Sequence, residues 1–554
     1  MTVKRHYFCF VFIGLSSIAY THSMDDIENF ANLELELFED DDSLAGDILT
    51  HKTPAPATAA EVVTLLITQA NALTLLQESL FLSTAPLNTR NPLDYTFFLP
   101  RLDYAKRSNF QMQLFWNQTN AMALGQGCNG PNTGIASYLG IQNPAITAQL
   151  NMVNDAFGGD FDPIGTIGLF KNTKIQERKF GFMFTGEHHF HPFTFCVSAP
   201  FYYAERNFYL TPDEQTAIED AFGKGSEDET WDFAQKHLIS DKIGLGDTRA
   251  SFVFDMFQRG ELQSRVGVFT TLPTSFSFFN SVMGTHFEPT TQPPTLDLVK
   301  LLSYAQGSTQ QDKDIAQAIG EEFFLGSIDH LAANILDVNL GYRKHVGLGA
   351  FLVSQTPLTV FIKRAWADDL YFKNKMSLQY LLPGDETRFF TELNDNAEYE
   401  ALGLNRSADD ILNQVDADPA YANQVLNFFQ DQLTEMFYPF VRTTRVSPGF
   451  VFESTSRLIY EKKRWFAYLG MDTWVQGKEK LGAVTFEKSP ILLIPDRQKA
   501  AMPVAYQGKV QTAIGYTVKR PERILLMMLH ADYTITSSGI GQDFTISLML
   551  ETNF

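Results

Sequence analysis

The chain closes with the segment Asp543-Phe-Thr-Ile-Ser-Leu-Met-Leu-Glu-Thr-Asn-Phe554, in which apolar and polar side chains alternate. One face is mostly apolar and consists of Phe544, Ile546, Leu548, Leu550, Thr552 and Phe554. The other face is mostly polar and consists of Asp543, Thr545, Ser547, Met549, Glu551 and Asn553. Because successive side chains of a β-strand point to opposite sides, this period of two predicts a strand with one apolar and one polar face.

The same alternation recurs upstream, from about residue 107, in segments of roughly ten residues separated by Gly, Pro, Asn or Asp. Its apolar positions include Phe110, Met112, Leu114, Trp116, Phe180, Phe182, Phe184, Phe252 and Phe254. Each segment matches the roughly 9–11 residues that a strand needs to cross a membrane, and the segments number about 12–14. We therefore predict an all-β fold over residues 107–554, a transmembrane antiparallel β-barrel.

Long insertions with helical periodicity interrupt the predicted strands near residues 211–240, 295–331 and 385–436. Other connections are tight turns. Long loops at one end and short turns at the other are typical of outer-membrane barrels.

The residues before the barrel divide into three parts. Residues 1–23 carry Lys4 and Arg5, then an uncharged apolar run, then small residues before Met24, which predicts a secretory signal peptide. Residues 24–60 form an acidic leader and linker that we expect to be disordered. Residues 61–106 are expected to be helical or to form a plug-like segment.

The composition excludes several classes of protein. The chain has 554 residues and a net charge of −21, which argues against a general nucleic-acid-binding protein. It has 48 Phe but only 3 Cys, so a disulfide-stapled fold is excluded, and whether Cys128 pairs with Cys196 stays open. No later segment offers about 18 consecutive apolar residues, so the exported chain is either released or crosses a membrane as a closed barrel.

The terminal segment resembles the C-terminal strand of Gram-negative outer-membrane β-barrels, whose final aromatic residue is read by the barrel-assembly machinery. The resemblance implies that Phe554 is the assembly signal, that the location is the cell outer membrane, and that outer-membrane lipid and this machinery are partners. Residues 244–247 (Gly-Leu-Gly-Asp) and 272–274 (Leu-Pro-Thr) are similar to a hairpin of barrels in the aromatic-hydrocarbon uptake group, which is related to long-chain fatty-acid transporters. That similarity implies small hydrophobic solutes.

Strand parity also selects the residues expected to line the lumen. These are charged or polar side chains opposite the apolar face of their strands: Arg249, Asp255, Arg265, Glu453, Arg457, Lys509, His530 and Asp532. Charges of both signs favour internal ion pairs over a simple ion filter. We predict no cofactor and no catalytic residue, although Ser547, His530 and Asp532 share polar faces, as a lipase-like barrel enzyme would require.

The one histidine cluster is residues 187–191, Glu-His-His-Phe-His. Imidazole and carboxylate groups are usual metal ligands. The cluster lies where two predicted strands meet, and no second cluster supplies the remaining ligands. We therefore predict a polar hairpin and no metal site.

These observations favour an outer-membrane channel for passive diffusion of small molecules. The alternatives are a surface-exposed structural or adhesive barrel, and a secreted soluble β-rich protein.

Overall fold

The computed structural model describes residues 57–69, 83–95, 108–124, 134–135, 173–214, 216, 235–259, 262–290, 293–307, 309–391, 397–484, 486–488, 491–493, 495–519 and 524–553. The predicted signal peptide, nearly all of the acidic leader, Cys128 and Phe554 lie outside these ranges. Cys196 is a buried free thiol. No helix in the described ranges combines the length and the apolar character needed to cross a membrane.

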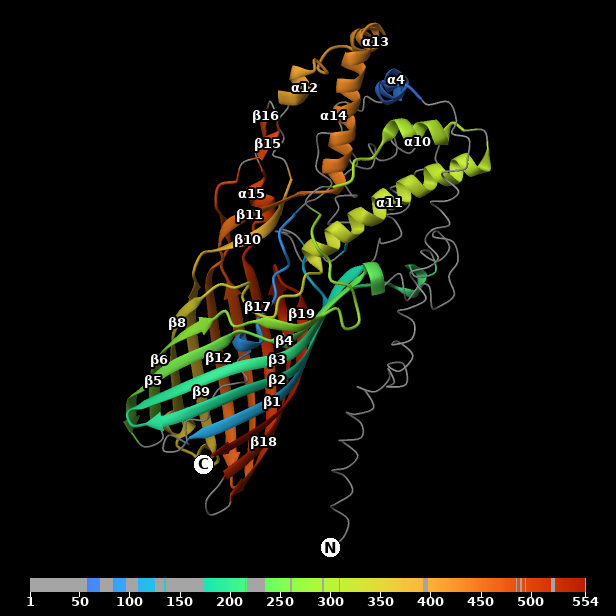
Figure 1. The fold of residues 1–554 in the computed structure, drawn as a ribbon. Helices are drawn as coiled ribbons and strands as arrows, with labels where there is room; N and C mark the ends of the chain where they lie inside the picture. Colours follow the sequence, from blue (N-terminus) through green and yellow to red (C-terminus); the bar gives the residue numbers. More distant parts are fainter. Residues whose placement is uncertain are drawn as a thin grey trace.

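The body of the molecule is a closed antiparallel barrel of twelve strands, as the sequence predicted (Figure 1). In order around the wall the strands are β1 (Asn109–Ala121), β2 (Lys174–Phe190), β3 (Phe193–Tyr209), β5 (Thr248–Arg259), β6 (Leu262–Leu272), β8 (Gly347–Pro357), β9 (Leu370–Leu381), β12 (Gly449–Lys462), β13 (Trp465–Gln476), β17 (Ala505–Lys519), β18 (Ile524–Ser538) and β19 (Gln542–Asn553). The first and last strands pair from Asn109 with Asn553 to Ala121 with Gln542. This seam removes the free edges that an open sheet would expose.

Side chains alternate between the two surfaces of the wall with the phase read from the sequence. In β19 the interior face carries Asp543, Thr545 and Ser547, which are buried, whereas Ile546 is exposed on the outside. Large apolar side chains are exposed around the outer wall, among them Phe180, Phe184, Phe252, Phe254, Leu469, Ile514 and Leu529. The barrel is therefore apolar outside and largely polar inside, the reverse of a water-soluble protein.

The two ends of the barrel differ. At one end, here called the short-turn end, four connections are short: residues 191–192, 260–261, 463–464 and 520–523. The connection between β8 and β9 at this end is longer, residues 358–369. At the other, the loop end, most connections are long and carry the helices (Figure 1). One connection there is short: residues 539–541 join β18 to β19. There, β4 (Ile239–Leu245) pairs with the second half of β3, and β7 (Phe276–Asn280) pairs with β4, so a short ribbon branches from the wall.

A helical cap lies beyond the loop end (Figure 1). It comprises α10 (Leu298–Ala305), α11 (Gln310–Ile335), α12 (Ala397–Ala401), α13 (Ala408–Ala417), α14 (Pro419–Phe437) and the earlier helix α4 (Ala59–Gln69). Helices α10 and α11 fall near the predicted insertion 295–331, and α12, α13 and α14 near the predicted insertion 385–436. Most of residues 211–240 lies outside the described ranges. Smaller elements complete this end: β10 (Gly384–Phe390), β11 (Phe440–Ser447), β14 (Lys480–Leu481), β15 (Phe486–Lys488), β16 (Ile491–Leu493) and α15 (Arg497–Ala500). At the opposite, short-turn end, the 3-10 turns η5 (Leu358–Val360) and η6 (Ala365–Ala367) lie in the connection between β8 and β9.

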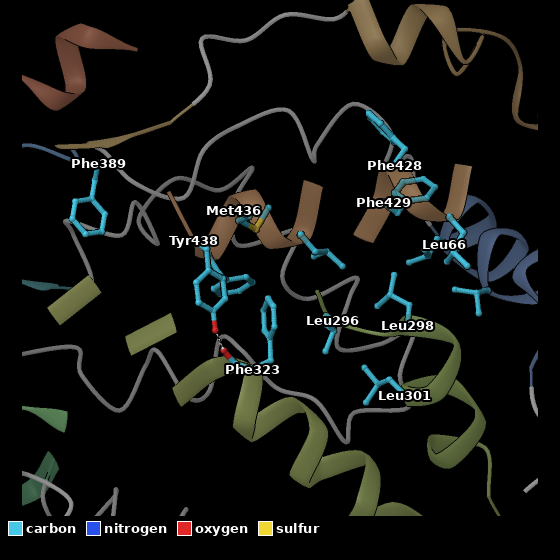
Figure 2. Packing of buried hydrophobic residues seen from close by; sticks show 14 of the residues in the cluster. Leu66, Leu296, Leu298, Leu301, Phe323, Phe389, Phe428, Phe429, Met436 and Tyr438 are labelled. Carbon is cyan, nitrogen blue, oxygen red and sulfur yellow. Dashed lines mark hydrogen bonds between the residues drawn. The ribbon is translucent and has the colours of Figure 1, made fainter. Parts of the chain in front are cut away.

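The cap helices share one hydrophobic core, which also includes Ile175 of β2 and Phe208 of β3. Figure 2 shows Leu66 of α4 close to Leu298 and Leu301 at α10 and to Phe429 of α14. The Tyr438 hydroxyl donates to the Phe323 carbonyl oxygen at 2.6 Å, which joins the end of α14 to α11. The N-terminal helix α4 is thus fixed to helices that lie hundreds of residues later in the chain.

His330 of α11 gives the cap a specific dependence on pH. Its Nε2 donates to the Pro439 carbonyl oxygen at 2.9 Å, and its Nδ1 accepts from the Thr290 amide at 3.2 Å, so the buried ring is held neutral. Burial lowers the pKa of His330 to about 4. Since the unfolded ring has a pKa of about 6.5, the stability this group contributes is complete above pH 6.5 and falls as pH drops toward 4, by about 3 kcal/mol in all.

We therefore expect the amides of α11 and α14 to exchange hydrogen faster relative to the intrinsic rate at pH 4.5 than at pH 7. His330→Gln cannot titrate and should weaken this pH dependence. Equal pH dependence in the wild type and the variant would contradict the assignment.

Candidate functional site: the barrel interior and its inner segment

Residues 83–95, here called the inner segment, lie inside the barrel against inward-facing side chains of several strands. The Ser83 hydroxyl and the Thr84 amide both donate to the Lys499 carbonyl oxygen near the loop end. The segment ends in the 3-10 turn η2 (Pro92–Asp94), which Asn91 caps by accepting from the Leu93 amide at 2.9 Å. Proline at the first helical position suits this turn because its missing N–H needs no partner there.

Arg90 attaches the inner segment to β13. Its Nη1 lies 2.6 Å from an Asp472 carboxylate oxygen, and both side chains are buried. The other oxygen of Asp472 accepts from the Thr455 hydroxyl at 2.8 Å. The Arg90 Nη2 donates to the Asp94 carbonyl oxygen at 2.6 Å, which also stiffens the segment itself.

Asp94 attaches the segment at a second point, through Arg249 of β5. The Arg249 Nη2 lies 2.7 Å from Asp94 Oδ1, and the Arg249 Nη1 donates to the Leu93 carbonyl oxygen at 2.8 Å. The Tyr342 hydroxyl and the Trp474 indole N–H also donate to Asp94. Burial, and then the adjacent Asp94 carboxylate, raises the pKa of Tyr342, so its hydroxyl keeps the proton it donates.

The Arg249 guanidinium rests on an aromatic ring of the wall. Its central carbon lies 4.7 Å from the centroid of the Phe269 ring, within cation–π range. Phe269 can lie flat because its cross-strand partner is Gly349, where a Cβ would come within 2.3 Å of the ring. A glycine on β8 thus sets the position of the arginine that holds Asp94.

A third contact group joins the segment to β2. The Lys179 ammonium donates to the Thr89 hydroxyl at 2.6 Å and to the Arg90 carbonyl oxygen at 3.0 Å. Glu177 pairs with Lys179 at 2.7 Å and with Arg206 of β3 at 2.7 Å, and Thr89 donates to it as well. These buried charges compensate one another, as charges removed from water must.

A charged network crosses the seam where the barrel closes. Lys509 of β17 lies 3.0 Å from Asp532 of β18 and 2.9 Å from Asp543 of β19. Asp543 also accepts from Asn117 of β1 at 2.7 Å and from the Thr534 hydroxyl at 2.6 Å. One carboxylate therefore links strands on both sides of the seam, and the Lys509 ammonium also lies 5.4 Å from the centroid of the Tyr95 ring.

The interior changes character toward the short-turn end. On the side formed by β12, β13, β17, β18 and β19, inward-facing apolar side chains pack there into a layer that consists of Ile459, Phe466, Tyr468, Ala513, Leu526, Met528 and Met549. On this side, the apolar layer is followed by a charged belt, defined here as Lys509, Asp532 and Asp543, and the inner segment lies next to that belt. A small cavity of about 10 Å³, the room of about one water molecule, lies between the inner segment and the wall near Asn117 and Asp543.

The residues predicted to line the lumen all take part in interior contacts. Besides Arg249, Lys509 and Asp532, Arg265 pairs with Asp255 at 2.7 Å, and Glu453 accepts from Ser377 at 3.0 Å. Arg457 donates to Gln511 at 2.9 Å. That these side chains line a path for solutes stays a prediction.

The arrangement of the lipase-like residues is that of a polar network. The Ser547 hydroxyl lies 3.4 Å from His530 Nδ1 and accepts from Gln113 at 2.6 Å, while Asp532 pairs with Lys509. The three residues are thus integrated with neighbours on β1 and β17.

Several anchoring residues were not predicted from the sequence: Arg90, Asp94, Glu177, Arg206 and Asp472. Parity would have found Glu177, Arg206 and Asp472, because each alternates with outward-facing neighbours on its strand. The Asn91-Pro92 pair marks a turn start. Nothing in that pair indicates that the turn lies inside the barrel.

No protein-family model matches the sequence, and no curated protein matches it. A COG4313 outer membrane channel from Pseudomonas putida F1 matches with a TM-score of 0.38 at 8% identity, over 82% of this chain and 100% of that one. The Pseudomonas putida toluene transporter TodX gives 0.29 at 9%, over 86% and 97%. The transport unit of the Escherichia coli autotransporter AIDA-I gives 0.29 at 8%, over 83% and 95%.

Proposed function

We propose that this protein is an outer-membrane channel for passive diffusion of small molecules, and that the inner segment closes it. The observation that carries the proposal is a closed barrel with an apolar outer wall and a charged interior occupied by residues 83–95. In hydrocarbon every backbone N–H and C=O must be satisfied within the protein, which a closed sheet achieves. Outer-membrane lipid would meet the exposed apolar side chains.

Opening would require the inner segment to leave its wall contacts. Two ion pairs anchor it: the segment supplies the cation in the pair of Arg90 with Asp472, and the anion in the pair of Asp94 with Arg249. Such pairs hold well when complete but are strongly destabilised when one partner is lost. The segment is therefore suited to a two-state gate, either docked or released.

The apolar layer supports hydrophobic solutes as the substrate class. A molecule moving between the charged belt and the short-turn end would pass Tyr468, Leu526 and Met528, which are apolar or aromatic. These side chains would hydrate a charged solute poorly. Small uncharged molecules with apolar surface suit this layer better.

Flux through reconstituted liposomes tests the channel. We expect a small aromatic solute to cross the membrane faster in proteoliposomes than in empty liposomes. The flux should be higher still with a variant that lacks the anchors Arg90 and Asp94. If neither protein exceeds empty liposomes, the channel proposal is wrong.

The membrane location makes a separate prediction at Ile514, which is 52% exposed on the outer wall of β17. Ile514→Lys would put a charge into lipid at a cost of about 2–4 kcal/mol. We expect much less folded protein in the carbonate-washed membrane fraction. Gln542→Lys, at the exposed loop end of β19, is the matched control and should fold normally. A secreted soluble protein would tolerate both changes equally and would leave the membrane pellet on washing.

The cap supports a second candidate function, a surface-exposed structural or adhesive barrel. Its helices lie beyond the end of the wall and could present a binding surface to a partner. A barrel of this kind would show no solute flux even after the inner segment is released, which distinguishes it from the channel.

A further inference from the structure

Two histidines of the β2–β3 hairpin meet an aspartate of the neighbouring strand at the short-turn end. His189 ends the inward-facing series of β2, His191 lies in the turn, and Asp255 lies on the inward face of β5. One ligand atom from each side chain lies within 4.8 Å of the others. The three donors therefore face one small volume at the mouth of the barrel interior.

The backbone holds this arrangement in place. β3 pairs with β5 with Phe193 opposite Phe254, and the Asp255 amide donates to the Pro192 carbonyl oxygen at 3.0 Å. This hydrogen bond brings the aspartate alongside the hairpin turn. Strand pairing therefore brings the backbones of the three residues together, whatever rotamers their side chains adopt.

Neighbouring side chains orient two of the donors. His189 Nδ1 lies 2.8 Å from the Thr194 hydroxyl, which leaves Nε2 as the ligand atom. Arg265 Nε lies 2.7 Å from Asp255 Oδ1, and the carboxylate has a second oxygen for a metal. Hydrogen bonds of this kind to metal-ligating histidines and carboxylates are the usual outer shell of protein metal sites.

The chemistry of the donors selects the class of ion. Two imidazoles and one carboxylate suit Zn²⁺ and similar transition metals, with a fourth position left for water. Mg²⁺ prefers oxygen ligands and retains its own waters. Ligands about 2.0–2.2 Å from one Zn²⁺ lie roughly 3.3 Å apart in a tetrahedral site. Small side-chain rotations would close the remaining gap.

We propose that His189, His191 and Asp255 form a binding site for a divalent transition metal at the short-turn mouth of the barrel. This differs from the sequence-based expectation, in which the hairpin lacked its remaining ligand. Asp255 supplies that ligand from β5, through a strand register that the sequence does not fix. The site does not depend on the channel function, and a bound ion would join the hairpin to β5.

Titration calorimetry with Zn²⁺ tests the site on the full mature chain in detergent micelles, after removal of any histidine tag. We expect one Zn²⁺ per chain, and binding weaker by about tenfold or more in His191→Ala and in Asp255→Asn. Both positions lie near the barrel mouth, and circular dichroism would verify that the variants are folded. A large excess of Mg²⁺ should not displace the Zn²⁺.

His188→Ala is the matched control. His188 belongs to the same hairpin but is exposed on the opposite face, with its Nδ1 2.8 Å from the Ser108 hydroxyl. We expect this variant to bind Zn²⁺ like the wild type. The proposal is overturned by absence of Zn²⁺ binding in the wild type, by wild-type affinity in His191→Ala or Asp255→Asn, by an equal loss in His188→Ala, or by displacement with Mg²⁺.

Discussion

Asp94→Ala is expected to release the inner segment from the barrel wall while leaving the barrel folded. The change removes the carboxylate that accepts from Arg249, Tyr342 and Trp474, and it leaves the Arg249 guanidinium largely buried without its ion-pair partner. Breaking a buried pair on one side costs about 3–5 kcal/mol. That cost falls on the docked state of the segment, because none of the strand pairings involves Asp94.

Maleimide labelling would measure the release. Thr89→Cys, in a background in which the native cysteines are replaced, places a thiol where the segment contacts Lys179 and Glu177. We expect slow labelling with Asp94 present and labelling at least tenfold faster with Asp94→Ala. Asp94→Asn keeps the shape and part of the hydrogen bonding, so its rate should fall between the two. Equal rates in all three would show that Asp94 does not hold the segment.

Lys509→Met is expected to destabilise the barrel itself. Lys509 is buried between Asp532 and Asp543, and its loss leaves two carboxylates close together with no cation between them. The expected cost is about 3–5 kcal/mol, seen as a lower midpoint of guanidinium unfolding in detergent. Since Asp543 also binds Asn117 across the seam, we expect the closure of β1 on β19 to weaken first.

A double variant separates lost charge balance from lost packing. Lys509→Met with Asp532→Asn removes one charge of each sign and relieves the repulsion between the carboxylates. The double variant should therefore be more stable than Lys509→Met alone, which is the sign of direct coupling between neighbouring sites. The network does not stabilise the seam if the losses in unfolding free energy of the two substitutions simply add, or if Lys509→Met unfolds like the wild type.

Strand parity carried most of the fold prediction. Phe544 and Ile546 face outward and Asp543 and Thr545 face inward, as the alternation in the last strand indicated. Parity is reliable here because a shift of one residue would move a whole set of side chains to the wrong surface. It also placed Arg249, Lys509 and Asp532 on buried interior faces, though it could not identify their partners.

The partners depend on tertiary structure that no local pattern encodes. Asp94 meets Arg249 because a short turn early in the chain is threaded into the barrel, and a three-residue turn has too little periodicity to predict. Asp255 meets His191 because the first half of β3 pairs with β5. The intervening strand β4 pairs instead with the second half of β3 and branches from the wall. Consecutive strands usually neighbour one another, but alternation alone does not fix the register that sets Asp255 beside the hairpin turn.

Single-channel recording in planar bilayers tests most directly whether the docked inner segment closes the barrel. The comparison is between the wild type and Arg90→Ala combined with Asp94→Ala, with Gln542→Lys as a control for the insertion of a folded barrel. We predict few or small conductance steps for the wild type and for Gln542→Lys, and larger, long-lived steps for the anchor variant. Identical conductance in all three, with maleimide labelling showing the segment released, would contradict the account.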